Sequence, residues 1–314
     1  MKQIGELKLI EEIRKKLPQR RREILTGIGD DAMVFKNGLV VSTDSFVEGV
    51  HFDLKYFNFY QLGFRTMAGS VSDLAAMAAE PVCVLVSLYL PKSVRKKDIR
   101  ELYRGFKSLA GRYRFDISGG DIVESPFWGV TLTVIGYTRK PLLRSTARPG
   151  DYLYVTNHLG LAETGRMVLQ NKYPRRRFKN AVRRHIFPEP RINEARVLKK
   201  YASAGIDTSD GLSTDAGHLA EESRVKIVIN ALSLPVHYEL LRLAEYRKID
   251  PVRFILSAGE DFEILFTGRR LPDLKTLKVF KIGRVLKGKG VWLERDGEIT
   301  PLKPTGFEHL RNPE

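Results

Sequence analysis

Carboxylates that stand beside glycine and small hydroxyl residues are the part of this sequence best suited to chemistry. They occur in six short segments, which we expect at the ends of strands: Asp30 and Asp31 in GIGDD, Asp44 in VVSTD, Asp73 in SVSD, Asp121 in SGGD, Asp207 and Asp210 in IDTSDG, and Glu260 and Asp261 in SAGED. The chain is otherwise basic, with 53 Lys and Arg against 37 Asp and Glu. Because so many carboxylates follow one pattern in so basic a chain, we expect them to share a counter-charge.

Magnesium is the counter-charge that this pattern favours. Hard divalent cations take oxygen ligands, and magnesium keeps several waters while it bridges a few carboxylates to substrate phosphates. The glycines Gly119 and Gly120 beside Asp121 allow backbone amides to approach phosphate oxygens. Phosphoryl transfer depends mainly on positioning and charge neutralisation. The segments therefore predict a magnesium-dependent site for phosphoryl transfer.

Simpler roles compete for some of these aspartates. A single aspartate in a glycine-containing turn is more often a turn or helix-cap residue than a ligand. We assign Asp31 and Asp215 to that class. Taken alone, Asp73 would join them as a cap, because Ser72-Asp73 precedes the helical run 74–79. Only its combination with the other segments favours a ligand role.

Other phosphate and metal motifs do not fit. The chain has no G-x-x-x-x-G-K-[ST], and GIGDDA at 27–32 matches the dinucleotide fingerprint in spelling only, since a hairpin is expected after it. The six histidines have no zinc spacing; His51 and His218, taken alone, are polar packing residues. The one cysteine, Cys83, lies in an apolar run and is expected in the core of a protein from a reducing compartment.

The elements that must position these residues belong to an α/β (α+β) protein of two domains. Apolar residues at helical spacing predict a surface helix over 4–17, and a hairpin is expected from 32–35 and 39–42, its second strand ending in Thr43-Asp44. Further helices are expected at 60–79, 95–113, 160–170, 191–203 and 213–223, and strands at 82–90, around Ile117 paired with 130–137, and at 152–156, 226–230, 263–267 and 279–285. A proline- and glycine-bearing segment near 140–150 divides the chain into domains 1–140 and 141–314.

The net charge of +16 does not by itself identify the kind of molecule that the protein binds. Much of it lies in the runs 20–22, 95–97, 175–177 and 183–184, which lack interleaved aromatic residues and are read as solvated faces. Nucleic-acid binding is kept as the alternative from a different class. No apolar stretch approaches the roughly 20 residues of a membrane helix, and residues 1–8 lack the features of a signal peptide, so we expect a cytoplasmic protein.

The motif series resembles that of the thiamine-monophosphate kinase family. The resemblance rests on GIGDDAMVF at 27–35, STDSFVEGVHF at 42–52, SVSDLAAMAAEP at 70–81, SGGD at 118–121, IDTSDGLSTDAGHLAEES at 206–223 and SAGEDFEILF at 257–266, in order along the chain. Single motifs such as SGGD are weak, whereas VEGVHF, DTSDGL and GEDFEILF together are specific. The family belongs with aminoimidazole-ribonucleotide synthetase, selenophosphate synthetase and a hydrogenase-maturation protein. Selenophosphate synthetase and the maturation protein need cysteines that Cys83 does not supply.

The resemblance implies a homodimer that forms through the sheet of its N-terminal domain and binds ATP in the cleft between the two domains. It implies transfer of a phosphoryl group from ATP to thiamine monophosphate, with several Mg²⁺ ions and no phosphoenzyme. Carried over by position, the magnesium residues are Asp30, Ser42, Thr43, Asp44, Asp73, Asp121, Asp207 and Asp210. The ATP residues are Gly120, Asp121, Arg144, Ser209 and Tyr103, and those for thiamine phosphate are His51, Glu260 and Phe307.

Asp210 is the residue expected nearest the transferring phosphoryl group, where a carboxylate orients metal or acceptor. The chain departs from the family pattern at Ser70, where Asn is frequent, at Ile122, where Thr is frequent, and at Phe307, where Trp is frequent. Ile122 removes a hydroxyl from the nucleotide side. Phe307 keeps an aromatic face, so attraction of a cationic ring at ~0.5–2 kcal/mol is retained.

Another synthetase or kinase of the superfamily, acting on a different small metabolite, is the nearest alternative.

Overall fold

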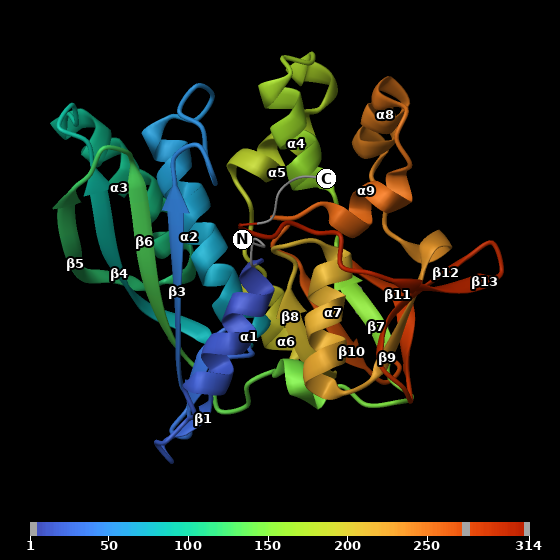
Figure 1. Cartoon of the computed structure of the whole chain (residues 1–314). Coiled ribbons are helices and arrows are strands. Elements are labelled where there is room, and N and C mark those ends of the chain that lie inside the picture. The colour runs from blue at the N-terminus through green and yellow to red at the C-terminus, as the bar shows by residue number, and fades with distance from the viewer. Residues whose placement is uncertain (1–4, 272–276, 311–314) are drawn as a thin grey trace.

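The computed structural model describes residues 5–271 and 277–310, and it has two mixed sheets with helices packed on and between them (Figure 1). The first sheet has the strand order β1-β2-β3-β6-β4-β5, with bounds β1 Ile24–Thr26, β2 Met33–Phe35, β3 Leu39–Val47, β4 Glu80–Leu90, β5 Asp116–Glu124 and β6 Gly129–Tyr137. Its neighbours are antiparallel except for the parallel pair β4 and β5. The α/β class is therefore confirmed.

The second sheet has the order β13-β12-β9-β11-β7-β10-β8, with bounds β7 Tyr152–Thr156, β8 Ala202–Asp207, β9 Lys226–Asn230, β10 Ile264–Gly268, β11 Val279–Leu286, β12 Gly290–Arg295 and β13 Glu298–Leu302. Only β9 and β12 pair in parallel. The helices are α1 Glu6–Lys16, α2 Phe59–Ala76, α3 Lys96–Tyr113, α4 Leu161–Gln170, α5 Lys179–Ile186, α6 Ile192–Leu198, α7 Leu212–Ser223, α8 Tyr238–Arg247 and α9 Pro251–Ser257. The division at 140/141 stays a prediction.

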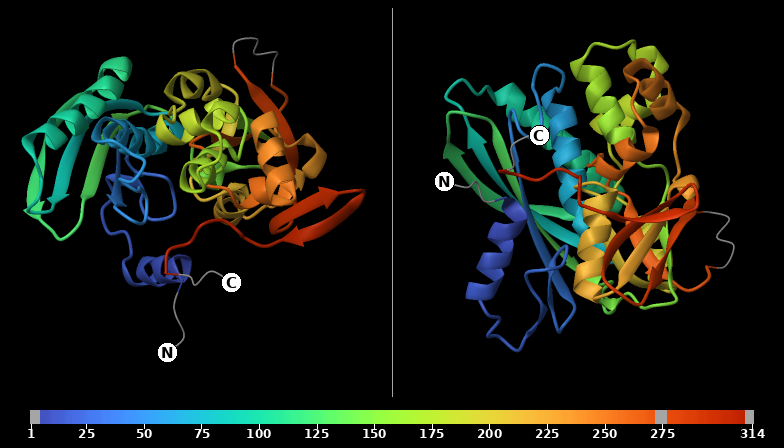
Figure 2. Two further views of the ribbon diagram at one scale, coloured as in Figure 1. Left: turned by 90° about the horizontal axis from the view of Figure 1, so that it is seen from above. Right: turned by 45° about the vertical axis from the view of Figure 1, so that its right-hand side comes forward.

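Helix α2 is the element that connects the two sheets. Its Ala-, Leu- and Met-rich sequence is buried on nearly every side, which is the pattern of an interior helix. It begins with a capping box, in which Asn58 and Gln61 each accept the other's backbone N–H. Gly63 lets it approach α3 closely, because a Cβ there would lie 2.1 Å from the carbonyl oxygen of Leu102. Its remaining surface packs on β8, α5 and α6. Helix α2 therefore lies between the first half of the molecule, which contains β1–β6 and α1–α3, and the second half, which contains β7–β13 and α4–α9 (Figure 2).

The apolar core follows this division. One cluster fills the space between the first sheet, α2 and α3, and it includes Ile186 and Ile192 from the second half. A separate cluster lies between the second sheet and α7. The face of the first sheet that α2 and α3 leave uncovered carries partly exposed side chains, among them Leu85 and Thr43. This open face matters for the assembly proposed below.

Helix α1 lies on the surface, as predicted, and none of its residues is buried. It is held by polar contacts: Arg14 donates to Glu222 of α7, and the Leu7 N–H donates to Glu308 at 3.3 Å. The Glu6 N–H donates to the carbonyl of His309 at 3.3 Å, and the His309 N–H donates to the Glu6 carboxylate at 3.0 Å. Within residues 5–271 and 277–310, no helix is long and apolar enough to cross a membrane.

Several sequence-based expectations are wrong in detail. The helix expected at 191–203 is the shorter α6 followed by strand β8. The strands expected around Ile117 and at 130–137 are present as β5 and β6, but they do not pair with each other because β4 lies between them. Strand β3 continues past Asp44 to Val47. Cys83 is only half-buried, on the open side of β4. The hairpin of β2 and β3 is confirmed.

Candidate functional site

Asp31, Asp73 and Asp207 come together from three distant parts of the chain: the loop before β2, the interior of α2 and the end of β8. One carboxylate oxygen of each lies within 4.8 Å of the other two. Ser42 of β3 donates a hydrogen bond to Asp73 at 2.5 Å, and Ser72 of α2 donates to Asp207 at 2.7 Å. Three carboxylates at this spacing form a ligand set suited to a hard cation.

Burial and mutual repulsion raise the pKa values of these carboxylates, because too few positive groups lie beside them. Burial, followed by repulsion from Asp44 and Asp207, raises the pKa of Asp73 well above its usual range. Burial and then Asp31 raise the pKa of Asp207 to about 8. In addition, Oδ2 of Asp31 is buried without a hydrogen-bond partner among the described residues. A divalent cation would remove both costs, so the residues fit magnesium.

Arg144 supplies part of the missing positive charge. Its Nη2 contacts Oδ1 of Asp31 at 2.6 Å, and its backbone N–H lies 3.3 Å from both carboxylate oxygens of Asp30. Burial and Asp31 raise the pKa of Asp30 to about 7, although Arg144 opposes this shift. One guanidinium beside a group of carboxylates leaves a net negative charge at this place.

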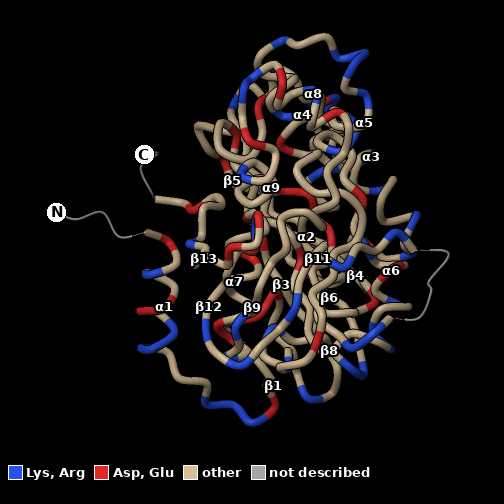
Figure 3. Tube along the Cα trace, turned by 90° about the vertical axis from the view of Figure 1, so that its right-hand side faces the viewer, with Lys and Arg blue, Asp and Glu red and all other residues tan. Residues whose placement is uncertain are grey.

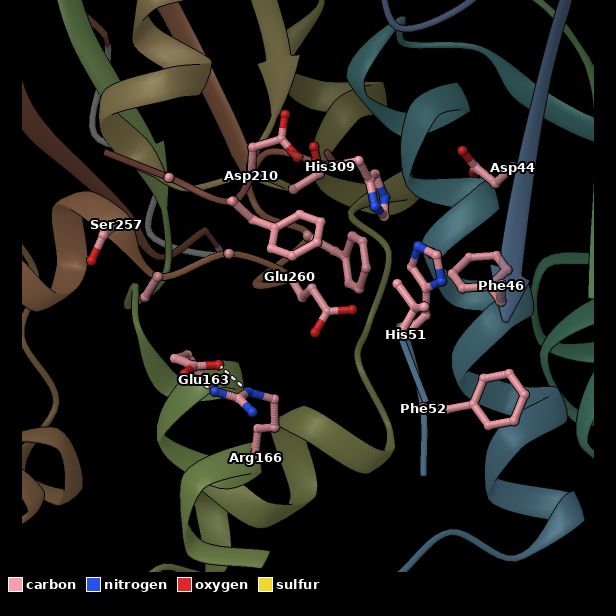
Figure 4. Close-up of a pocket in the computed structure, with 18 of the residues that line it drawn as sticks. Asp44, Phe46, His51, Phe52, Glu163, Arg166, Asp210, Ser257, Glu260 and His309 are labelled. Atoms are coloured by element: carbon pink, nitrogen blue, oxygen red, sulfur yellow. Dashed lines mark hydrogen bonds and ion pairs between the residues drawn. The ribbon is translucent and has the colours of Figure 1, made fainter. Parts of the chain in front are cut away.

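A cavity of about 690 Å³ extends from the carboxylates toward the helices of the second half (Figure 4). The first-half elements that line it are β3, the loop 48–57 and α2, and the second-half elements are α4, α9, the loops 207–210 and 257–262, and the segment 305–309. Of the residues predicted for the site, those that line it are Asp44, His51, Asp73, Asp207, Ser209, Asp210, Glu260 and Phe307. The cavity therefore brings predicted metal, nucleotide and acceptor residues into one space.

Aromatic rings form one wall of the cavity. The ring of His51 lies 5.8 Å from that of Phe46 and 5.2 Å from that of His309, and Phe307 meets His309 edge-on at 4.7 Å. The backbone N–H of Val47 donates to Nδ1 of His51 at 3.1 Å, so the neutral ring carries its proton on Nε2. Burial and then His309 lower the pKa of His51, which favours this neutral form.

Glu260 points into the centre of the cavity in Figure 4 and is held by a buried arginine. Arg65 of α2 is 2% exposed, and its Nη2 lies 2.6 Å from Oε2 of Glu260. At the far end, Arg166 of α4 donates to Glu163 at 2.6 Å, with Tyr56 also lining the wall. The carboxylates of this part of the cavity therefore have cationic partners.

Asp210 lies at the junction of the loops that close the cavity. The N–H of Phe307 donates to its carbonyl at 2.9 Å, and a Cβ on Gly306 would lie 2.3 Å from the same oxygen, so this approach requires glycine. Burial, followed by Glu6, raises the pKa of the Asp210 carboxyl to about 6. Asp215 accepts the backbone N–H groups of Asp210 and Gly211 at 3.3 and 3.1 Å, which confirms its assignment as a cap and turn residue.

Other predicted residues lie apart from this cavity within one chain. Thr43 points to the open face of the first sheet, where its hydroxyl meets that of Thr133 at 3.1 Å, opposite to Asp44. Gly120 and Asp121 lie on β5, which is three strands away from β3 across the sheet. At the usual strand spacing, β5 and β3 are roughly 14 Å apart. Tyr103 of α3 packs edge-on against Phe106 at 5.3 Å. A single chain does not bring these residues to the carboxylate group.

Some site residues were missed or misassigned from sequence. The assignment of Asp31 to turn residues is wrong, because its carboxylate is buried, paired with Arg144 and close to Asp73. The cap alternative for Asp73 is also excluded, since α2 begins at Phe59. Arg65 was not singled out, although a lone arginine in an apolar helical run was a visible signal. Phe46, Glu163, Arg166 and His309 lacked any such signal.

Comparison with known proteins gives one consistent result. The model for the N-terminal domain of AIR synthase related proteins matches residues 29–138. The chain is 34% identical over 315 residues to the thiamine-monophosphate kinase of Aquifex aeolicus (strain VF5), covering 99% of each. It is 36% identical over 308 residues to that of Bacillus subtilis (strain 168), covering 91% of this chain and 93% of the relative. The chain belongs to the thiamine-monophosphate kinase family.

A solved structure of this family, described as AaThiL complexed with AMPPCP and TMP, has a TM-score of 0.89 to this chain at 33% identity and covers 97% of both. The arrangement of the two mixed sheets is therefore shared with that structure. Phe307, with 55% of the residue exposed, contributes an aromatic side chain to the wall of the cavity.

Proposed function

We propose that this protein transfers the γ-phosphoryl group of ATP to thiamine monophosphate and forms thiamine diphosphate. The observation that carries the proposal is one cavity with crowded carboxylates at one end and aromatic rings at the other. A phosphoryl-transfer enzyme needs both: charge neutralisation for the nucleotide phosphates and a defined position for the acceptor. Membership of the kinase family supports the choice of acceptor.

Asp31, Asp73 and Asp207 would hold magnesium. Asp44 and Asp210 line the same cavity, and Asp30 shares Arg144 with Asp31, so these three are proposed to help hold several ions. Bound Mg²⁺ would neutralise charge on the phosphates of ATP and on the transferring group. Ser42 and Ser72 orient two of the carboxylates by hydrogen bonds. Asp210, at the junction of carboxylates and acceptor wall, would orient the acceptor phosphate for in-line attack.

The acceptor is expected against the aromatic wall. Phe46 and Phe307 offer ring faces to a cationic thiazolium, and such contacts contribute ~0.5–2 kcal/mol. His51 presents a neutral imidazole whose Nε2–H suits a phosphate oxygen or ring nitrogen. Glu260 adds a carboxylate that attracts a cationic or amino-bearing ring. Together these residues select an acceptor with an organic cation and a phosphate.

We further propose that two copies associate through the open face of the first sheet. Val82 and Leu85 of β4 and Val123 of β5 are 39–49% exposed there, and Gly120 and Asp121 lie beside them on β5. A dimer formed through this face would cover these apolar residues. It also accounts for nucleotide residues that one chain leaves outside its cavity. Replacing Leu85 and Val123 by Asp is expected to give a monomer in sedimentation with weakened ATP binding.

The direct test is incubation of the purified protein with ATP, Mg²⁺ and thiamine monophosphate, followed by chromatography of thiamine diphosphate. Unphosphorylated thiamine and EDTA serve as controls. Product that forms only from the monophosphate and only with Mg²⁺ supports substrate, reaction and metal together. Absence of product with ATP binding retained would refute the acceptor and leave another small metabolite as the substrate.

A further inference from the structure

Helix α2 carries two polar side chains that each hold a carboxylate of the second half. Ser72 donates to Asp207 at 2.7 Å, and Arg65 pairs with Glu260 at 2.6 Å. Seven residues separate Arg65 from Ser72, which is two helical turns, so both lie on one face about 10 Å apart along the axis. One rigid helix therefore joins the metal end of the cavity to the acceptor end.

Arg65 is unusual in its surroundings. Its side chain is 2% exposed within the interior helix α2, where an unpaired guanidinium would be strongly destabilising. Besides Glu260, its Nη1 donates to the carbonyl oxygen of His185 in α5, and its guanidinium lies 5.8 Å from the ring of Phe57. These contacts fix the guanidinium in one place, and its planar fork suits a carboxylate.

Glu260 needs such a partner because its backbone alone does not set its carboxylate. The residue has a φ of +62°, which is uncommon outside glycine, and its N–H donates to the carbonyl of Ser209 at 2.8 Å. Phe262 repeats the pattern by donating to Thr208 at 2.9 Å. This backbone is joined to the loop beyond Asp207, while the side chain remains free to rotate without Arg65.

We propose that Arg65 is a positioning residue that holds the Glu260 carboxylate at a fixed distance from the Asp207 group, so that α2 aligns the acceptor with the metal-bound phosphates. This rests on the proposed function, since it assigns Glu260 to acceptor binding. Arg65 itself does not line the cavity. Its effect on the reaction therefore passes through Glu260.

The test compares Arg65→Met with Arg65→Lys and with the matched control Arg196→Met. Arg196 also joins the two halves, through a 2.6 Å pair with Glu80, but 46% of its side chain is exposed and it does not line the cavity. We expect Arg65→Met to raise the KM for thiamine monophosphate at least about tenfold with the KM for ATP within about twofold, because one side of the acceptor site is released. Arg65→Lys should recover part of the loss, and Arg196→Met should change neither KM.

Two further measurements separate positioning from general stability. In the Glu260→Gln background, Arg65→Met should add little to the acceptor KM, because a residue that acts through another is non-additive with it. In a crystal structure of the unliganded Arg65→Met variant, the Glu260 carboxylate should take a different rotamer or several rotamers while the Glu260 N–H still donates to the Ser209 carbonyl, and Arg196→Met should leave this side chain unchanged. An unchanged Glu260 rotamer, or an acceptor KM within about twofold of the wild type, overturns the inference. Failure of the wild type to form product refutes the proposed function instead, and the Glu260 rotamer still decides the role of Arg65.

Discussion

The two ends of the cavity contain similar carboxylates in opposite electrostatic states. At the metal end, Asp31, Asp73 and Asp207 crowd within 4.8 Å with Arg144 as a partial counter-charge. At the acceptor end, Glu260 has Arg65 as its partner and Glu163 has Arg166. The negative charges of Glu260 and Glu163 at the acceptor end therefore have arginine partners within the same chain. At the metal end, the carboxylates outnumber their cationic partners, and the proposed magnesium ions would balance this excess.

The same contrast explains how charge is used elsewhere. Figure 3 shows Lys and Arg spread over many outer elements, including the end of the molecule formed by α4, α5 and α8. Arg184, read from sequence as solvated, has only 11% of its side chain exposed and is paired with the buried Glu263. The net charge of +16 is thus a property of the surface, while the metal end of the cavity has an excess of negative charge.

The largest effect should come from Asp210→Asn, which alters the junction of the two ends. We expect turnover to fall by about 10³-fold or more, equivalent to about 4 kcal/mol of transition-state stabilisation. Folding should be unaffected, because the backbone contacts of Asp210 with Phe307 and Asp215 are retained. Steady-state kinetics with circular dichroism as a control measures this; full activity of the variant would refute the assignment.

The next effect is the response of stability to Mg²⁺ and pH. Burial and then Asp31 raise the pKa of Asp207 from 3.8 to about 8 in the folded protein, so the folded state binds more protons than the unfolded state between these pH values. The free energy of unfolding of the metal-free protein therefore falls as pH rises through this window. Mg²⁺ should raise the thermal midpoint more at about pH 8 than at about pH 6. Equal shifts at both pH values, seen by calorimetry, would argue against metal binding at these carboxylates.

A smaller effect is expected at the acceptor end, which depends on contact more than on charge. Phe307→Ala should raise the KM for thiamine monophosphate by about tenfold, or about 1.4 kcal/mol, with the KM for ATP unchanged. Phe307→Trp should preserve or lower it, since the larger ring keeps the same face. If Phe307→Ala raised both KM values equally, the separation of the two ends would be wrong.

The smallest effect is expected on folding stability, in a variant that has lost activity. Asp207→Asn removes one crowded charge while an amide oxygen still accepts from Ser72. We expect the metal-free variant to be more stable than the wild type by about 1 kcal/mol at about pH 8, although inactive. Urea unfolding without Mg²⁺ measures this. A destabilised variant would show that the charge is already compensated.

The sequence predicts those parts of the structure that local patterns control. Helical spacing placed α1 and α3, and Lys36-Asn37-Gly38 placed the hairpin, because such signals lie within a few residues. Strand pairing depends on distant segments, so the insertion of β4 between β5 and β6 was not visible. Strand β8 was not predicted, and the expected helix at 191–203 overlapped its first two residues, since the short segment Ala202–Ile206 carries no clear period.

The site was predictable to the same extent. Repeated Asp-containing motifs indicated Asp73 and Asp207, whereas the distinction between Asp31 and Asp215 depends on tertiary contacts: one meets Arg144 and the other caps a loop. The expectation that Asp44 ends a strand failed because β3 continues for three residues to pair with β6. Side chains alternate between the two faces of a strand, but the sequence does not say which face is packed against the core. For this reason the position of Thr43 on the open face could not be predicted.

The contacts between Glu6 and His309 have a mechanical consequence. The two segments are joined by backbone and carboxylate hydrogen bonds, whereas each sheet is held by many bonds in parallel. A force that pulls Glu6 and His309 apart would therefore release α1 and the segment 305–309 before any strand separates. The wall containing Phe307 would open while Asp31, Asp73 and Asp207 stayed together. Single-molecule extension would record this as a small first step, reversible and weakened by the substitution Glu6→Gln.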